Sequence, residues 1–372
     1  MTDRLRTRPP VKHDAIVQHL RSLVVGERAL RPGARVPTRS EIGDHFGVSA
    51  MTVQRAFDRV IDEGFLAVAG NAGTVVSDHP PHLHRFVLSV PGHPGDSRWV
   101  RFWDLLAHEA NRWSDDAHSH MVVAQDADPA LDAVVAERLA HEIADHRVAG
   151  ILFVTDSPWI TASLLRGTDI PRLAFTGLKA NSDVPGISLG GEGTLWFTRA
   201  VERLHERGRK RIALITVPGL GQPRQLELWQ RLLEQRGLTC DPALIQMAGQ
   251  WDARWATNLV FSLFRGPADQ RPDALVVADD NLVEQVCAGL YRLGLRVPDD
   301  LDVIAHANFP LAAPAALPFT RLGFDIPQVF ALAMDLLLRQ QRREGVPRVT
   351  AVHPRFEDES EQRSEGISEY RL

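Results

Sequence analysis

Two short helical patterns joined by a tight turn lie between residues 37 and 64, and they limit the fold of the chain more than any other stretch. Thr38 and Glu41 have the spacing of a capping box, which predicts a helix that starts beside Thr38 and ends at Gly47. Ser49 suits the N-cap of a second helix, in which apolar side chains recur on one face. The stretch therefore predicts a helix-turn-helix.

The second predicted helix has an outward face that suits DNA recognition. With its apolar residues turned to the core, a rotation of about 100° per residue leaves Met51 and Arg55 facing outward, with Thr52 and Gln54 on the flanks. Residues near the start of such a helix reach base edges in the major groove. We therefore expect this face to read DNA.

The run FLAVAGNAGTVV, which follows Gly64, predicts two short strands around Gly70, Asn71 and Gly73, the pattern of a hairpin wing. The stretch from about Val11 to Val76 resembles the winged helix of the GntR family of bacterial transcription regulators. The segments RPGARVPT, GVSAMTVQRAF, DEGFL and NAGTVV carry this resemblance. It implies a homodimer that binds a double-stranded, palindromic operator, since such heads read paired half-sites by two-fold symmetry.

Eight side chains are predicted to contact DNA: Thr38, Arg39, Ser49, Met51, Thr52, Gln54, Arg55 and Asn71. The chain departs from the family pattern at Ser40 and Ala50, where the family commonly has arginine. Arg39 and Gln54 are the expected substitutes, and Asn71 lies at the predicted tip of the wing. The alternative is a winged helix that binds protein or serves as a scaffold.

Composition sets broad limits on the class of protein. A length of 372 residues suggests two or three domains, and 44% hydrophobic with 24% charged residues is usual for a globular chain. The formal net charge of -5 does not by itself indicate a nucleic-acid partner. Two distant cysteines predict no disulfide and a reducing cytoplasm, and no apolar run is long enough to predict a membrane span.

Short apolar strand patterns alternate with longer amphipathic helical patterns from residue 85 onward, as in RFVLSV before WVRFWDLLAHEANRW. This alternation predicts crossover units and parallel sheets that are covered on both faces. A region of about 275 residues exceeds one typical domain, so we expect two lobes with a cleft between them.

The segment ALVVADDNLVEQVCAGLYRLGLRVPDDLDVIAH resembles the ligand-binding domain of LacI-type regulators, which is built like periplasmic sugar-binding proteins. HRVAGILFV, DIPRLAFTG and RGRKRIALIT extend the resemblance over roughly Arg85 to Phe356. The expected fold is α/β, with a winged helix-turn-helix joined to a two-lobed, periplasmic-binding-protein-like domain with parallel sheets. The resemblance implies a small-molecule effector, sugar-like, bound between the lobes.

Four regions follow from these patterns. We expect a DNA-binding head at residues 1–76, a linker at 77–84, a LacI-type ligand-binding domain at 85–358 and a disordered tail at 359–372. The linker, SDHPPHLH, is predicted to be semi-rigid because adjacent prolines neither continue a helix nor donate to a sheet. Its histidines at positions 79, 82 and 84 are predicted to be solvent-exposed, and no metal site is expected.

Ligands of open parallel sheets bind beyond the carboxyl ends of the strands. The resemblance implies ligand-binding roles for Asp279 and Asp280, and for Arg224 near the start of a helix. Asn308 and Ala307 stand where the family usually has aspartate. Carboxylates and amides suit the hydroxyl groups of a polyol.

Several tryptophans lie near predicted loop or helix starts and offer flat apolar faces for sugar C–H surfaces: Trp99, Trp159, Trp196 and Trp251. Trp99 and Trp159 are the two that we assign to the ligand site. The alternative for each tryptophan is ordinary packing in the core or on the surface.

Enzyme motifs are weak in this chain. GISLG at residues 186–190 matches Gly-x-Ser-x-Gly but lacks the long preceding strand and the immediate helix of a nucleophile elbow. HEIADH spaces its histidines five apart, so they cannot share one metal-binding face of a helix. We expect no catalytic residue and no cofactor, and a ligand-controlled repressor of transcription in the cytoplasm. The alternative is a metabolite-processing enzyme, with Ser188 or Asp280 as the residue to test, whose winged helix localises it.

Overall fold

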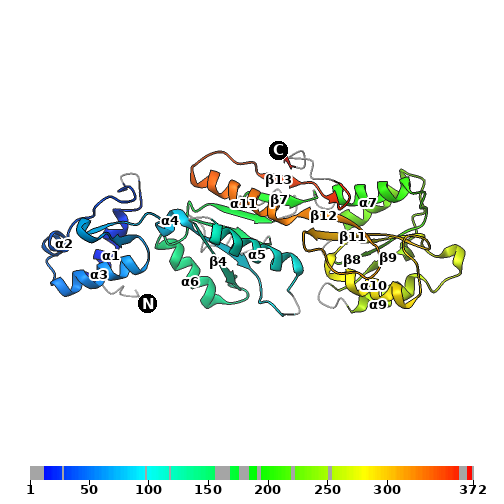
Figure 1. Cartoon of the computed structure of the whole chain (residues 1–372), viewed down its shortest axis with the longest axis horizontal. Helices are drawn as coiled ribbons and strands as arrows, with labels where there is room; N and C mark the ends of the chain where they lie inside the picture. The colour runs from blue at the N-terminus through cyan, green and yellow to red at the C-terminus, as the bar shows by residue number, and fades with distance from the viewer. Residues whose placement is uncertain are drawn as a thin grey trace, which may run out of the picture.

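The computed structural model describes most of the chain, and the account below refers to that part. The described residues are 12–26, 29–96, 99–116, 119–155, 168–175, 184–190, 194–218, 223–249, 254–359 and 367–370. Figure 1 shows a small helical unit at one end of the molecule, followed by two larger lobes, each built on a sheet. In this part of the chain no helix combines the length and the hydropathy that crossing a membrane requires.

The small unit, here called the head, is a winged helix-turn-helix. It consists of three helices and a two-stranded antiparallel hairpin: α1 (Lys12–Ser22), α2 (Arg39–Phe46), α3 (Ala50–Asp62), β1 (Leu66–Val68) and β2 (Thr74–Val76). Thr38 and Glu41 form the predicted capping box, and Gly47 ends α2 with a φ of 59°, in the left-handed region that suits glycine. Ser49 caps α3 as predicted.

The core of the head comes from the apolar face of α3. Val53, Phe57 and Val60 are buried there together with Ile16 and Leu20 of α1. Spacing at i, i+4 and i+7 places the α3 residues on one helical face, which explains why this face turns inward. The opposite face of α3 is left for solvent.

The N-terminal lobe contains a seven-stranded sheet with the order β15-β13-β7-β6-β5-β3-β4. Its pairs are parallel except that of the edge strand β15 with β13. The strands are β3 (Arg85–Val90), β4 (His120–Gln125), β5 (Gly150–Phe153), β6 (Arg172–Phe175), β7 (Gly186–Leu189), β13 (Val349–Val352) and β15 (Ile367–Tyr370). The helices of this lobe are α5 (Arg101–Asp116), α6 (Ala133–Ala144) and α11 (Ile326–Gln341).

The C-terminal lobe contains a six-stranded sheet with the order β14-β12-β11-β10-β8-β9. Only the β12 pair with β14 is antiparallel among these described strands. The strands are β8 (Ile212–Thr216), β9 (Ile245–Met247), β10 (Ala274–Val277), β11 (Asp302–Phe309), β12 (Thr320–Asp325) and β14 (Arg355–Phe356). The helices are α7 (Thr194–Glu206), α8 (Pro223–Glu234), α9 (Trp255–Leu263) and α10 (Val283–Arg292).

The chain passes between the lobes after β7, after β12, after β13 and after β14. Strands such as Ala274–Val277 are buried along their whole length, because helices cover both faces of each parallel sheet. The fold is therefore the two-lobed α/β architecture that the alternation of strand and helix patterns predicts.

Two details differ from the sequence-based expectations. Ile367–Tyr370 lies in the segment predicted to be disordered, yet it forms β15 through antiparallel pairing with β13. The linker contains a short helical turn, α4 (Pro81–His84), in which Pro81 occupies the first turn. Proline is tolerated there because the first helical N–H groups have no partner within the helix.

Candidate functional site

The exposed face of α3 is the first candidate site. Met51 is 63% exposed and Arg55 is exposed, whereas Val53 and Phe57 on the opposite face are fully buried. The side chain of Ser49 accepts a hydrogen bond from the Thr52 N–H and contacts the Thr52 hydroxyl at 3.0 Å. Ser49 and Thr52 therefore form the cap of α3, and Met51 and Arg55 point away from the core.

Arg39 joins α2, α3 and the wing. Its Nε donates to Gln54 Oε1 at 2.7 Å, and its Nη1 donates to Thr74 Oγ1 on β2 at 3.1 Å. The guanidinium also lies 4.5 Å from the ring centroid of Phe57, a cation–π distance. Gln54 in turn donates to Asp58 at 2.6 Å. Arg39 thus fixes the wing against α3, a role that spacing alone does not reveal.

The other predicted DNA-contacting residues lie on the same unit. Thr38 is exposed at the start of α2, where its hydroxyl accepts the Glu41 N–H. Asn71 is exposed in the turn of the wing, between β1 and β2. The head therefore exposes the start of α2, one face of α3 and the tip of the wing to solvent.

A buried ion cluster connects the head to the N-terminal lobe. Arg21 is 1% exposed, and its Nη2 donates to both carboxylate oxygens of Glu63 at 2.7 Å. Its Nη1 lies 2.6 Å from Asp145 Oδ1, and Gln18 donates to the same oxygen at 3.3 Å. Burial acts to lower the pKa of Arg21, but bonds to the two carboxylates outweigh it and the pKa is raised.

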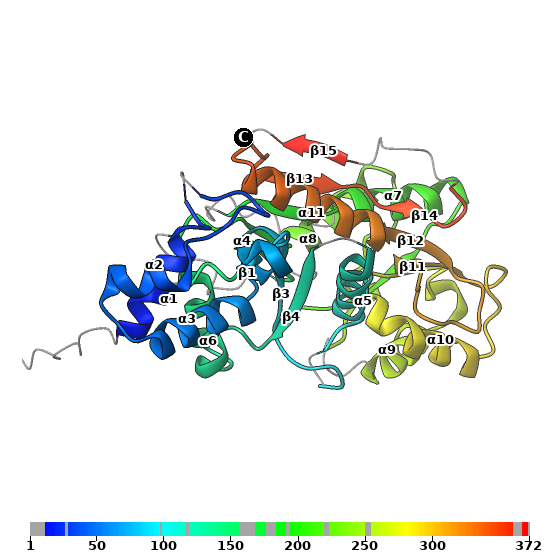
Figure 2. The ribbon, with the colours of Figure 1, turned by 60° about the vertical axis from the view of Figure 1, so that its left-hand side comes forward.

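The cluster lies at the ends of two helices. Glu63 follows the last residue of α3, and Asp145 follows the last residue of α6. Figure 2 shows the head beside the end of the N-terminal lobe that carries α6. The orientation of α3 is therefore tied to the N-terminal lobe through one buried guanidinium.

The linker is packed into the same junction. The ring of His82 stacks on Phe65, with centroids 6.0 Å apart, so the prediction that this histidine is exposed is wrong. Burial first, and then the charges of His146 and His84, lower the pKa of His82 to about 4. Gln341, the last residue of α11, donates to the Leu83 carbonyl at 3.0 Å. Among the described residues no cluster of metal-ligating side chains is found.

A cleft of about 740 Å³ lies between the two lobes. The side formed by the N-terminal lobe, here called the wall, includes Val100, Phe102, Trp103 and Asp126. The side formed by the C-terminal lobe, here called the floor, includes Asp279, Asp280, Asn281, His306 and Asn308. Asp126 follows β4, and Asp279 and Asp280 follow β10, so polar groups lie beyond the carboxyl ends of parallel strands. The cleft is within the size range of small-molecule sites.

Asp279 and Asp280 form the floor of the cleft with Asn281 and Asn308. Asp279 Oδ1 accepts the backbone N–H and the side-chain amide of Asn281, at 2.8 and 2.7 Å. Asp280 Oδ2 accepts the Asn308 amide at 2.7 Å. Burial raises the pKa of both carboxyl groups, and the neighbouring Asp280 charge raises that of Asp279 further.

His306 lies beside this floor on β11, and the sequence did not single out its side chain. Its ring is 5.7 Å from Trp196 and 5.8 Å from Phe324, centroid to centroid. Burial lowers its pKa to about 4, so the ring is neutral near pH 7. Nδ1 has no hydrogen-bond partner among the described residues. The available signal in the sequence was its position: His306 directly precedes Ala307 and Asn308, which were considered for the ligand site.

Arg101, at the start of α5, crosses from one lobe to the other. Its backbone N–H donates to Asn281 Oδ1 at 3.1 Å, and its Nη2 donates to the Leu311 carbonyl at 3.0 Å. Its Nε lies 3.9 Å from Asp280 Oδ2. Arg101 therefore connects the start of α5 to the C-terminal lobe.

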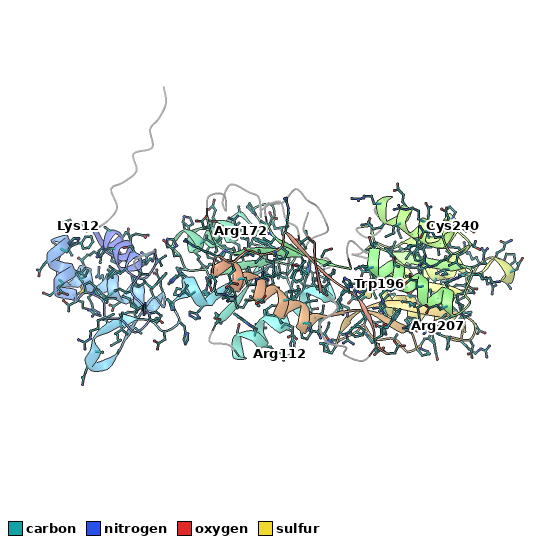
Figure 3. The ribbon with its side chains drawn as sticks, turned by 90° about the horizontal axis from the view of Figure 1, so that it is seen from above. Lys12, Arg112, Arg172, Trp196, Arg207 and Cys240 are labelled. Carbon is teal, nitrogen blue, oxygen red and sulfur yellow. The ribbon has the colours of Figure 1, made fainter. Side chains whose placement is uncertain are left out.

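Other predicted ligand-binding residues lie elsewhere. Arg224 is exposed at the start of α8 and Trp99 donates to Asp104 at 2.5 Å; neither belongs to the described lining of the cleft. Trp103, which packs edge-on against Trp99, takes the lining position instead. Trp196 is a core residue whose indole donates to the Leu322 carbonyl, and Figure 3 marks its place in the C-terminal lobe. Trp159 and Trp251 lie outside the described residues.

Comparison with known proteins fits this arrangement. Residues 12–76 match the family model "Bacterial regulatory proteins, gntR family", and residues 201–357 match "Periplasmic binding protein-like domain". Catabolite control protein A of Priestia megaterium is 23% identical over 214 residues, which are 56% of this chain and 62% of that protein. The ribose operon repressor of Escherichia coli (strain K12) is 28% identical over 158 residues, 40% of this chain and 47% of the repressor. The chain thus spans less than two thirds of the length of these relatives.

Solved structures support the fold. A regulatory protein of the LacI family from Chloroflexus aggregans has a TM-score of 0.60 at 17% identity, over 73% of this chain and 96% of that one. The lac repressor dimer bound to operator and an anti-inducer has a TM-score of 0.57 at 16% identity, over 74% of this chain and 92% of that one. The two-lobed fold is therefore shared with these structures.

Proposed function

We propose that this chain is a transcription repressor whose affinity for operator DNA is controlled by a small molecule bound between the lobes. One observation carries the proposal: an exposed helix-turn-helix face and a polar interlobe cleft occur in one chain, joined by a buried ion cluster. The similar proteins named catabolite control protein A and ribose operon repressor support it.

The head supplies the DNA contacts in this proposal. α3 enters the major groove with Met51 and Arg55 toward the base edges, and Thr38, Ser49 and Thr52 lie near the backbone. Arg39 and Gln54 support this face from the side, and Asn71 brings the tip of the wing to the adjacent backbone. Two heads of a homodimer read the half-sites of a palindromic operator, in the cytoplasm.

α11 gives the cleft a mechanical route to the head. Its first residue, Ile326, follows β12 at a crossing between the lobes, and its last residue, Gln341, holds the Leu83 carbonyl of the linker. Figure 1 shows this helix along the N-terminal lobe. A ligand that favours one lobe arrangement changes operator affinity by its differential binding to the two arrangements. Residues 77–84 are the linker and 85–358 the sensor in this division.

The cleft has the character of an effector site rather than a catalytic one. Ser188, the candidate nucleophile, is 1% exposed within β7. A strand interior gives its hydroxyl no approach for a substrate, unlike the sharp turn of a nucleophile elbow. Polar groups on the floor and aromatic side chains on the wall suit a sugar-like metabolite, which they bind without turnover.

Operator binding is tested by fluorescence anisotropy with a palindromic fragment from upstream of the coding sequence. Arg55→Ala is expected to weaken binding about 5–150-fold, because a base-edge contact by arginine contributes about 1–3 kcal/mol. Arg265→Ala, a change of another exposed arginine on the C-terminal lobe, is expected to have no effect. Affinity falls steeply with salt if phosphates are contacted.

The proposal fails if the protein binds the upstream fragment and unrelated DNA equally well and no metabolite changes either affinity. It also fails if Arg55→Ala and Arg265→Ala have the same effect. A specific site is expected to bind about a thousandfold or more tighter than unrelated DNA.

A further inference from the structure

We propose that the cleft takes a hydroxylated amine, such as an amino sugar, and that Asp279 and Asp280 receive its protonated amino group. The inference rests on the proposed function, because it names the chemical class of the effector. It follows from a surplus of hydrogen-bond acceptors and negative charge at the floor of the cleft.

The described lining of the cleft is rich in carboxylates. Asp96 and Asp126 lie toward the solvent side, and His93 contacts both. Its backbone N–H donates to the Asp96 carboxylate at 2.9 Å, and its ring Nε2 lies 3.0 Å from Asp126 Oδ2. Asp279 and Asp280 lie deeper, at 9% and 4% exposure. The deep pair is therefore the part of the lining that a bound molecule must satisfy.

The negative charge of Asp279 and Asp280 is not fully compensated by the described side chains around them. Arg101 Nε is 3.9 Å from Asp280, beyond hydrogen-bond distance, and its other contacts are to Asn281 and Leu311. No lysine or arginine among the described residues lies within ion-pair distance of Asp279. Asp279 Oδ1 already accepts two bonds from Asn281, which leaves Oδ2 for a ligand.

Asn308 supplies an independent sign of a missing donor. It is 2% exposed, and its Oδ1 has no hydrogen-bond partner among the described residues. Its Nδ2 donates to the Asp280 carboxylate at 2.7 Å, so exchanging the amide oxygen and nitrogen would set two acceptors against each other. The oxygen therefore points away from Asp280 and lacks a donor. A buried unsatisfied acceptor is unfavourable, and a ligand N–H or O–H would satisfy it.

Burial of adjacent carboxylates makes an ammonium group the matching partner. Burial and mutual repulsion raise the pKa of Asp279, and burial raises that of Asp280, so two negative charges are unfavourable here without a cation. A ligand ammonium donates three hydrogen bonds and removes the repulsion. An anionic ligand would add to it.

The opposite wall explains why the amine should carry a ring. Val100, Phe102, Trp103 and Leu189 give this side of the cleft an apolar surface. Such a surface packs against the C–H face of a sugar ring, and an aromatic face also favours a nearby cation. Hydroxyl groups on the same ring can donate to Asn308. The arrangement suits a molecule that combines a ring, hydroxyls and one amino group.

The test compares sugars that differ in one substituent, using the full-length protein and isothermal titration calorimetry. Glucosamine, galactosamine and mannosamine are paired with glucose, galactose and mannose, and glucosamine is also paired with its N-acetyl form. At least one amine is expected to bind tenfold or more tighter than its neutral counterpart. Asp279→Asn keeps the acceptor for Asn281 and removes the charge, and it is expected to abolish that preference. Asp269→Asn, an exposed aspartate on the C-terminal lobe, is expected to leave it unchanged.

The outcomes separate this inference from the proposed function. If no amine binds better than its neutral partner, or Asp279→Asn keeps the preference while circular dichroism shows it folded, the inference is overturned. Release of operator DNA by neutral sugars alone would overturn the inference and leave the proposed function standing. Amine binding that never changes operator affinity would support the inference and contradict the proposed function.

Discussion

At the residue scale, the floor of the cleft depends on one glycine in β12. Gly323 pairs with Ala307 on β11, and a Cβ at position 323 would overlap the Ala307 carbonyl and amide backbone. The neighbour of Ala307 is Asn308, whose amide holds Asp280. The close approach of two strands therefore sets the position of the polar floor.

Gly323→Ala tests this dependence. The added methyl group must push β11 from β12, so the free energy of unfolding should fall by about 1–3 kcal/mol or more, as in overpacked cores. Urea denaturation measures the change. Gly345→Ala is the matched control, because a Cβ there meets no atom within 4 Å. Equal unfolding free energies for the two variants would contradict the close approach.

His82 gives the junction between head and sensor a pH dependence. Its pKa is about 4 in the folded chain against 6.5 for the free side chain, so the unfolded chain binds a proton first as the pH falls. Stability should therefore decrease between pH 6.5 and pH 4 and be unaffected by this group above pH 7. Comparison of urea midpoints at pH 7.5 and 5 should show a smaller loss in His82→Gln than in the natural chain. The same loss in both would show that His82 is not buried against Phe65.

At the element scale, the sequence predicted most of the head and the sheets. Capping residues and periodic apolar positions are local signals, and Thr38, Gly47 and Ser49 act as predicted. Buried parallel strands show as continuous apolar runs, which explains why ALVVA was recognisable as β10. The edge strand β15 was missed because its few residues are ordered by pairing with β13 rather than by a pattern of their own.

The lining of the cleft was only half predictable. Asp279 and Asp280 follow β10, and Asn308 lies near the end of β11. They could be predicted because ligands of parallel sheets bind beyond the carboxyl ends of the strands. Phe102 and Trp103 come from α5 on the other lobe, and their place depends on how closely the lobes approach. Arg224 and Trp99 lie outside the described lining of the cleft, because position near a helix start does not define the direction of a side chain. The Arg39 and Arg21 contacts join distant segments and left no local signal.

At the scale of the whole molecule, the head and the N-terminal lobe are joined at one junction. Arg21 forms ion pairs with Glu63 of the head and with Asp145 of the N-terminal lobe. The helix α11 begins where the chain passes between the lobes, and its last residue contacts the linker. Removing Asp145 would leave the Arg21–Glu63 pair in the head. The head would keep its fold and lose its fixed orientation on the sensor.

The central claim, that the state of the cleft reaches the DNA through this junction, is tested by operator titrations of the natural chain and Asp145→Ala. Affinity is measured by anisotropy with and without the sugar that binds the cleft most tightly in calorimetry. We expect a ligand effect of about 5–150-fold in the natural chain and below about twofold in Asp145→Ala, with operator binding retained. Glu137→Ala, on the exposed side of α6, should behave as the natural chain does. An unchanged ligand effect in Asp145→Ala, or no effect of the cleft ligand in the natural chain, would contradict the account.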